Sequence, residues 1–253
     1  VVLSDDETVS VMLNEEDHVR EQVILGGYRL DDAYRIADAL DDRIGETADF
    51  AYSRKYGYLT ACPTNLGTGM RASVMMFLPA LTLSGELKRN AGALAKMNVT
   101  LRGVYGEGSD ALGYVCQISN KRTLGVTETE ILSFVRSAVE SIAAAEKDAR
   151  ERLSAVRGDA LVDEIARAYG IASCSYMLGA KQAIDALSLI KLGAYYGVIA
   201  AKNVAKIDEL IIAVSPFNLV SAAARPLNTE KARDIYRAET VRNAIKNIAK
   251  LNL

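Results

Sequence analysis

The sequence reads CPTNLGTGMR at residues 62–71, and no other segment of the chain constrains its chemistry more closely. One run of strand type precedes this segment and another follows it, so we expect it to form a loop at the end of a strand. Gly67 and Gly69 allow the backbone of such a loop to approach a ligand closely, and Arg71 adds a permanent positive charge. No Lys-Ser or Lys-Thr pair follows the glycines, so the loop is not a Walker A phosphate-binding loop. The alternative interpretation is a tight turn in which Cys62 is merely packed.

Two further polar segments stand beside predicted strands. They read NEEDHVR at 14–20 and RGVYGEGS at 102–109. The three segments together place Arg20, Arg71 and Arg102 at strand ends. Guanidinium groups bind phosphate oxygens in bidentate fashion and keep their charge, so a cleft lined by them suits a nucleotide triphosphate. Taken singly, each segment is also consistent with a solvated loop or a turn.

The composition excludes several classes of protein. The chain has 253 residues, of which 50% are hydrophobic and 25% are charged, so it can bury a large core. Its 30 basic and 32 acidic residues leave no basic surplus for binding nucleic acid. No apolar run reaches the roughly 20 residues of a membrane span, and no signal peptide is recognisable. Three separated cysteines and one histidine do not suit a zinc site, so we expect no protein-bound metal and a reducing cytoplasm.

The pattern of apolar residues predicts an α+β fold followed by a helical bundle. Strands are predicted at 8–13, 50–53, 56–61, 72–78, 99–104 and 113–119. Helices are predicted at 31–44, 81–97, 161–169, 180–192, 204–214 and 229–251, and from Thr127, whose hydroxyl can cap a helix. We expect two domains, 1–153 and 154–253, with the segment 154–159 around Gly158 as the link. Charge supports this division, because residues 1–153 carry 17 basic and 23 acidic groups whereas residues 154–253 carry 13 and 9.

The three polar segments, in this order and spacing, resemble the guanidino (phosphagen) kinase superfamily. Thr64, the segment 105–109 and the run MMFLPAL at 75–81 are most similar to the bacterial protein-arginine kinases within that superfamily. The resemblance covers nearly the whole chain. It implies a catalytic domain with a largely antiparallel sheet flanked by helices at 1–153, and a small all-helical domain at 154–253. The implied reaction transfers the γ-phosphoryl group of ATP, which carries Mg²⁺, to arginine side chains of proteins.

The resemblance also implies a role for each motif residue. The roles fall on six residues, the phosphate-binding Arg20, Arg71 and Arg102 and the guanidinium-binding Glu16, Glu107 and Cys62, the last as a thiolate. The chemistry agrees with these roles, because an arginine side chain has a pKa above about 12 and is a poor nucleophile until its lost proton is accommodated. Carboxylates placed on the guanidinium nitrogens supply that environment.

The C-terminal part contains the sequence RDIYRA at 233–238, which resembles a phosphoarginine-binding motif of the same kinases. Arg233 and Arg237 are four residues apart on one helical face and could bind a phosphate while Asp234 accepts from the bound guanidinium. The alternative is a solvated helix with intrahelical charge pairs. The resemblance implies partners as well: protein substrates with exposed arginines, phosphoarginine peptides, a zinc-binding activator adaptor, a Clp-type unfoldase and a second copy of the chain. It implies that substrates are tagged for Clp-type proteolysis in a stress response, without nucleic acid or membrane contact.

Two other functions remain open from the sequence. The chain could be a noncatalytic phosphoarginine-binding regulatory fragment, or a kinase for a small free guanidine such as arginine. In the superfamily an N-terminal region supplies a small domain and further clamp arginines, and neither precedes Val1 here. We therefore expect a fragment of a longer protein, whose phosphate clamp is incomplete and whose rate alone is lower by on the order of a thousandfold.

Overall fold

The computed structural model describes residues 1–103 and 112–253, which form two compact units. The first unit contains Val1–Met76, Lys88–Arg102 and Gln117–Ala144. The second contains Phe77–Leu87, the described part of Gly103–Cys116, and Ala145–Leu253. The chain therefore passes between the units several times.

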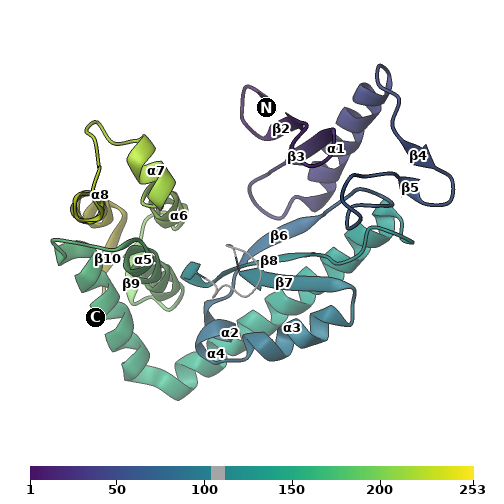
Figure 1. Cartoon of the computed structure of the whole chain (residues 1–253). Helices are drawn as coiled ribbons and strands as arrows, with labels where there is room; N and C mark the ends of the chain where they lie inside the picture. Colours follow the sequence, from purple (N-terminus) through teal and green to yellow (C-terminus); the bar gives the residue numbers. More distant parts are fainter. Residues whose placement is uncertain (104–111) are drawn as a thin grey trace. The chain divides into compact units, whose positions relative to one another are not determined.

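Three small sheets carry the loops of the first unit (Figure 1). Their strands are β1 (Val2–Leu3), β2 (Val9–Leu13), β3 (Val19–Val23), β4 (Tyr52–Ser53), β5 (Gly57–Tyr58), β6 (Ser73–Phe77), β7 (Val99–Gly103) and β8 (Val115–Asn120). The strand orders are β1-β2-β3, β4-β5 and β6-β8-β7, and the pairs β1–β2, β2–β3 and β4–β5 are antiparallel. The predicted strands are confirmed, whereas β3 is an addition: Arg20 lies within a strand and not in a loop.

Helices cover these sheets and complete the core of the first unit. They are α1 (Leu30–Gly45), α3 (Leu87–Ala95) and the first part of α4 (Glu128–Cys174). The predicted capping residue of α4 is confirmed: the Glu130 amide donates to Thr127 Oγ1 over 3.2 Å, and the Glu130 carboxylate accepts from the Thr127 amide over 2.8 Å. This reciprocal pair is a capping box. Ile131 and Val135 on α4 and Ile118 on β8 are completely buried in the core of this unit.

The second unit is mainly helical. Its elements are α2 (Pro79–Leu83), the short 3₁₀ turn η1 (Leu112–Tyr114), the later part of α4, α5 (Ala180–Tyr195), α6 (Ala205–Ala213), α7 (Pro216–Ser221), α8 (Glu230–Ile248), β9 (Ile199–Ala201) and β10 (Ala249–Leu251). The antiparallel pair β9–β10 modifies the expectation of an all-helical C-terminal part. Residues 249–251 were predicted to extend the last helix, but Ala249 is buried opposite Ala201 and the backbone there is extended.

One predicted helix was wrong, and the predicted link has a different local structure. The single helix predicted at 81–97 is two helices, α2 and α3, on either side of Gly85, whose φ of 74° is unfavourable for other residues. The segment 154–159, predicted to be a link between domains, is helical apart from a kink at Gly158, and the division at 153/154 stays a prediction. Gly158 alone has non-helical angles there, with φ 44° and ψ −122°, so the helix is interrupted at one residue and resumes. None of the helices in the described ranges is both long and apolar enough to span a bilayer.

Candidate active site

The first motif forms the tip of a hairpin. Strands β2 and β3 pair Met12 with Arg20, and the Asn14 amide donates to His18 O over 3.0 Å to close the turn. Glu16 lies at this tip and is exposed. Arg20 forms an ion pair with Glu15 over 2.7 Å, with both side chains about half exposed. The hairpin therefore presents the exposed carboxylate of Glu16 at its tip and the guanidinium of Arg20 on the adjoining strand.

Asp17 joins this tip to the loop that contains Cys62. Its carboxylate accepts from the Ala61 amide over 2.5 Å and from Asn65 Nδ2 over 2.9 Å. The hydrogen bond from Asn65 is the main reason that the pKa of Asp17 is lowered. Glu16 and Cys62 are 46 positions apart in the sequence. The loops that contain them are held together by these two hydrogen bonds of Asp17. The sequence analysis missed this role of Asp17, although its position within NEEDHVR was a signal for it.

Cys62 is partly exposed on its loop. Its Sγ lies 3.0 Å from Thr64 Oγ1, and its carbonyl accepts from Thr60 Oγ1 over 2.7 Å and from the Asn65 amide over 3.0 Å. These bonds fix the backbone around the thiol. Cys62 is therefore accessible on a loop that hydrogen bonds hold in place.

The far side of the same loop is fixed by Gly67 and Thr123. A Cβ on Gly67 would lie 2.3 Å from Thr123 O, so glycine alone fits at this position, where φ is 110°. Thr123 Oγ1 lies 2.9 Å from Thr64 O and 2.8 Å from Leu66 O, close enough to donate to either. Thr123 is a second positioning residue that the sequence analysis did not identify.

Three arginines interact electrostatically in the first unit. Arg71 Nη2 donates to Ser119 Oγ over 3.3 Å. Burial lowers the pKa of Arg71, and the positive charges of Arg102 and Arg20 lower it further. Like charges near one another are unfavourable unless an anion joins them, so this arrangement suits the binding of a phosphate chain.

One half-buried carboxylate lies on the same strand as Arg20. Glu21 follows it on β3 and therefore faces the opposite side of the sheet. Burial, followed by the negative charge of Asp41, raises the pKa of Glu21 to about 7. Asp41 in turn accepts a hydrogen bond from Tyr58 over 2.9 Å.

Glu107 lies outside the described residues, so its predicted role stays a prediction. Among the residues that are described, no group of three or more His, Cys, Asp and Glu side chains could hold a metal ion.

The RDIYRA segment lies on α8 in the second unit. Arg237 is 2% exposed; its Nε donates to Val214 O over 3.0 Å, and its Nη1 donates to Leu178 O over 2.9 Å and to Asp234 over 2.6 Å. Arg233 is less buried and donates to Leu227 O over 3.2 Å. In this conformation Arg237 joins three parts of the helical unit, and the binding of phosphoarginine by these residues remains a prediction.

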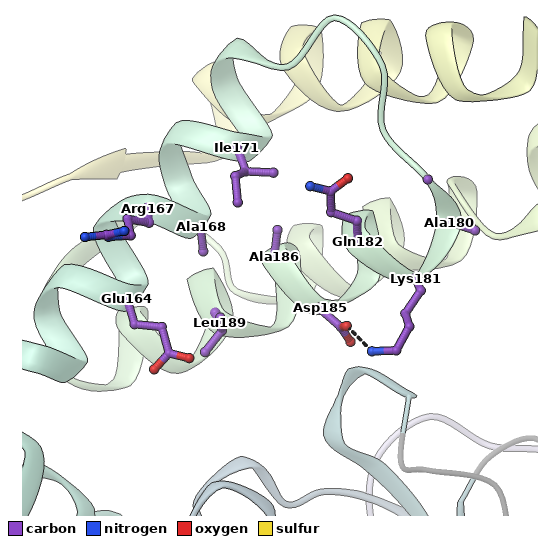
Figure 2. Close-up of a pocket in the computed structure, with 11 residues that line it drawn as sticks. Glu164, Arg167, Ala168, Ile171, Ala180, Lys181, Gln182, Asp185, Ala186 and Leu189 are labelled. Carbon is purple, nitrogen blue, oxygen red and sulfur yellow. Dashed lines mark hydrogen bonds and ion pairs between the residues drawn. The ribbon is translucent and has the colours of Figure 1, made fainter. Parts of the chain in front are cut away.

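A cavity of about 660 Å³ lies within the second unit, between α4 and α5 (Figure 2). Its wall is mostly apolar, with Ile171, Ala186 and Leu189. The charged groups at its rim are paired within the unit, as Lys181 is with Asp185 over 2.5 Å. No predicted site residue lines it.

Two family models and several curated proteins match the chain. The family model described as "ATP:guanido phosphotransferase, C-terminal catalytic domain" matches residues 1–149, and "Protein-arginine kinase McsB C-terminal domain" matches residues 158–253. The protein-arginine kinase of Halothermothrix orenii is 42% identical over 245 residues, which are 97% of this chain and 70% of that protein. The protein-arginine kinase of a Geobacillus species is 43% identical over 247 residues, 97% of this chain and 67% of that protein.

Solved structures give the same fold for part of the chain. The duplicated taurocyamine kinase from Schistosoma mansoni, with bound components of a transition-state analogue, is 36% identical with a TM-score of 0.53. That match covers 58% of this chain and 20% of the kinase. A lombricine kinase is 28% identical with a TM-score of 0.51, over 57% of this chain and 40% of that one. The chain thus spans less than half of either solved kinase.

Proposed function

The chain belongs to the ATP:guanido phosphotransferase family, and from that membership we propose that it is an ATP-dependent protein-arginine kinase. The observation that carries the proposal is the pairing of two features in the first unit. Arg71 lies in the positive field of Arg20 and Arg102, and Asp17 bonds the loop of Glu16 to the loop of Cys62. The first feature suits a polyphosphate and the second suits a guanidinium group.

The three arginines would bind the phosphate oxygens of ATP. Phosphoryl transfer needs in-line positioning and neutralisation of charge on the oxygens, which guanidinium groups supply without a P-loop. Mg²⁺ would add to this neutralisation when it is bound to the nucleotide. We propose that ATP itself carries this ion.

Glu16, Glu107 and Cys62 would bind the substrate guanidinium. A nitrogen of that group forms a bond to the γ-phosphorus, and the bond from this phosphorus to the bridging oxygen breaks, which releases ADP. The nitrogen loses a proton, which a carboxylate of Glu16 or Glu107 would accept. The product is phosphoarginine.

The second domain would recognise that product. We propose a division at 153/154, with Arg233, Asp234 and Arg237 as phosphoarginine-binding residues, which the match of the second family model to residues 158–253 supports. Since Arg237 donates to Leu178 and Val214, a phosphate that binds to it would compete with these carbonyls or use its remaining donors.

The wider role follows from the kinases that the chain is similar to. We propose that it acts in the cytoplasm on proteins with exposed arginines, marks them for a Clp-type unfoldase and protease in a stress response, and works with a zinc-binding adaptor and a second copy of itself. The names of the relatives support protein as the substrate class.

Transfer of radiolabelled γ-phosphate from ATP to an arginine-rich protein tests the proposal. We expect an acid-labile label, as a phosphorus–nitrogen bond gives, which is lost in Arg71→Ala and Cys62→Ser. Arg43→Ala is the matched control, because Arg43 is an exposed arginine on α1 that forms an ion pair with Glu46. Equal turnover of free arginine would instead indicate a small-guanidine kinase. A chain that binds phosphoarginine peptide but transfers no label would be a regulatory fragment.

A further inference from the structure

The end of β8 carries two buried polar side chains. The strand reads VCQISN, and Ser119 and Asn120 are 0% and 7% exposed, whereas Lys121 and Arg122, which follow, are exposed. A buried amide or hydroxyl is costly unless it is hydrogen-bonded, so the partners of these two side chains indicate what they do.

Asn120 bonds the backbone on both sides of Arg71. Its Oδ1 accepts from the Ala72 amide over 2.9 Å, and its Nδ2 donates to Met70 O over 3.1 Å. The backbone N–H of Asn120 also donates to Ala72 O over 3.3 Å. The side-chain Nδ2 of Asn120 also donates to Arg122 O over 2.8 Å, and this bond orients the side-chain amide. One side chain therefore fixes the peptide groups that precede and follow Arg71.

Ser119 acts on the guanidinium itself. Its Oγ accepts from Arg71 Nη2 over 3.3 Å, and it is fully buried. The backbone of Arg71 and its charged end are thus both held from two consecutive residues of β8.

The like charges around Arg71 explain why its backbone and side chain need to be held in place. Arg71 lies in the field of Arg102 and Arg20, and although Arg20 also pairs with Glu15, these like charges disfavour the charged Arg71 when no anion is bound. Without a fixed backbone, the loop would relieve this repulsion by moving Arg71 away. A rigid support keeps the group in place before the ligand arrives, so less ordering is needed on binding.

We propose that Asn120 is a positioning residue for the nucleotide site, which holds Arg71 in its phosphate-binding position with the help of Ser119. This inference rests on the proposed function, because it assumes that Arg71 binds ATP. Neither residue is placed in contact with the nucleotide. Their effect passes through Arg71.

The test measures ATP binding and kinetics on the full chain. Asn120→Ala should raise the dissociation constant and the KM for ATP about tenfold, with a smaller change in kcat, because about one phosphate contact becomes disordered. Ser119→Ala should raise them about threefold. Asn218→Ala, which removes an amide that donates to Ile212 O in the second unit, should leave both constants unchanged.

A double-mutant cycle separates positioning from general destabilisation. In an Arg71→Ala background, Asn120→Ala should weaken ATP binding no further, because its effect needs the guanidinium. Asn120→Asp keeps the acceptor for Ala72 and loses the donor to Met70, so it should give an intermediate affinity. If Asn120→Ala does not fold, the Ser119→Ala and Asn120→Asp variants decide the question by the same constants.

Two results would overturn the inference, and they can be told apart. A wild-type chain that binds no ATP removes the proposed function and with it the premise. A wild-type chain that binds ATP, with variants at Asn120 and Ser119 that bind it equally well and only melt earlier, leaves the function intact and shows a purely structural role.

Discussion

Arg71 and Arg237 are both arginines in family motifs, but the two units use them in opposite ways. Arg71 is exposed, lies in the field of two other guanidinium groups and donates a hydrogen bond to Ser119 Oγ. Arg237 is 2% exposed, and two backbone carbonyls and a carboxylate accept from it. The first guanidinium is held by surrounding polar groups and faces outward, whereas the second is itself the support for its surroundings.

The comparison shows that the role of an arginine in a motif can be inferred only when its hydrogen-bond and charge partners are known. A charge that is satisfied within the protein contributes to stability, and its loss leaves buried acceptors without donors. A charge crowded by like charges contributes little or negatively to stability and is available to an anion. The two sites should therefore respond in opposite ways to the same substitution.

The largest effect is expected from Arg237→Ala. This variant should lose about 3–5 kcal/mol of unfolding free energy, because the carbonyls of Leu178 and Val214 and the carboxylate of Asp234 lose their buried donor. Chemical denaturation monitored by circular dichroism measures it. Arg237→Ala with unchanged stability would remove the contrast between the two arginines.

The second effect is expected from Arg71→Ala. We expect kcat/KM for ATP to fall about a hundredfold, the loss typical of one donor to a transferring phosphoryl group, while the melting temperature is unchanged or slightly higher. Steady-state kinetics and thermal unfolding on one preparation measure both. A variant that melts much earlier would mean that Arg71, too, is a structural arginine.

A third variant, Asp17→Asn, separates the guanidinium side of the site from the nucleotide side. Asp17 accepts from the Ala61 amide and from Asn65 Nδ2 with different oxygens, and Asn replaces one of these oxygens by an NH2 donor, so the loops of Glu16 and Cys62 should separate. We expect kcat to fall about tenfold with the KM for ATP unchanged, since one or two hydrogen bonds are lost away from the arginines. A rise in the KM for ATP of the same size would contradict this separation.

The smallest effect concerns Glu21, the half-buried carboxylate beside Arg20. Its pKa is about 7 in the folded chain and 4.5 as an ordinary glutamate, so the folded state binds the proton more tightly. The unfolding free energy should therefore fall as pH rises from about 4.5 to about 7, and stay level above that range. Because Glu21 is only about half buried, the change should be below about 1 kcal/mol.

Glu21→Gln checks this expectation. The variant should lack that decline, and at pH 8 it should melt slightly above the wild type, while at pH 4.5 the two should agree. The opposite sign, with the wild type more stable at pH 8, would show that Glu21 is stabilised as a carboxylate.

The sequence predicted the strands around the site and the start of α4 because these depend on local patterns. Alternation identifies Val9–Leu13, and the Thr127–Glu130 pair is a four-residue signal. The sequence did not predict the break at Gly85 or the helical conformation of Ser154, because a single glycine such as Gly85 or Gly158 can occur either within a helix or in a link between helices. The β9–β10 pair depends on contacts 50 residues apart, which no local window contains.

The sequence predicted the motif residues of the candidate site, but it did not predict the residues that hold them in position. Arg20, Arg71 and Cys62 stand in distinctive segments, whereas Thr123 and Asn120 act through backbone carbonyls and amides that any residue provides. Such bonds leave no pattern in a single sequence. For the same reason nothing in RDIYRA distinguishes the buried Arg237 from the more accessible Arg233.

Helix α4 crosses from one compact unit into the other at Ala144 and Ala145 without a break, and its first non-helical residue is Gly158. Its buried residues belong to both cores, Ile131 and Val135 to one and Leu153 and Ile165 to the other. Unfolding of either core would remove packing contacts from α4, which also packs in the other core. Calorimetry should accordingly record a single cooperative transition, and damage in either unit should lower the temperature at which the whole chain unfolds.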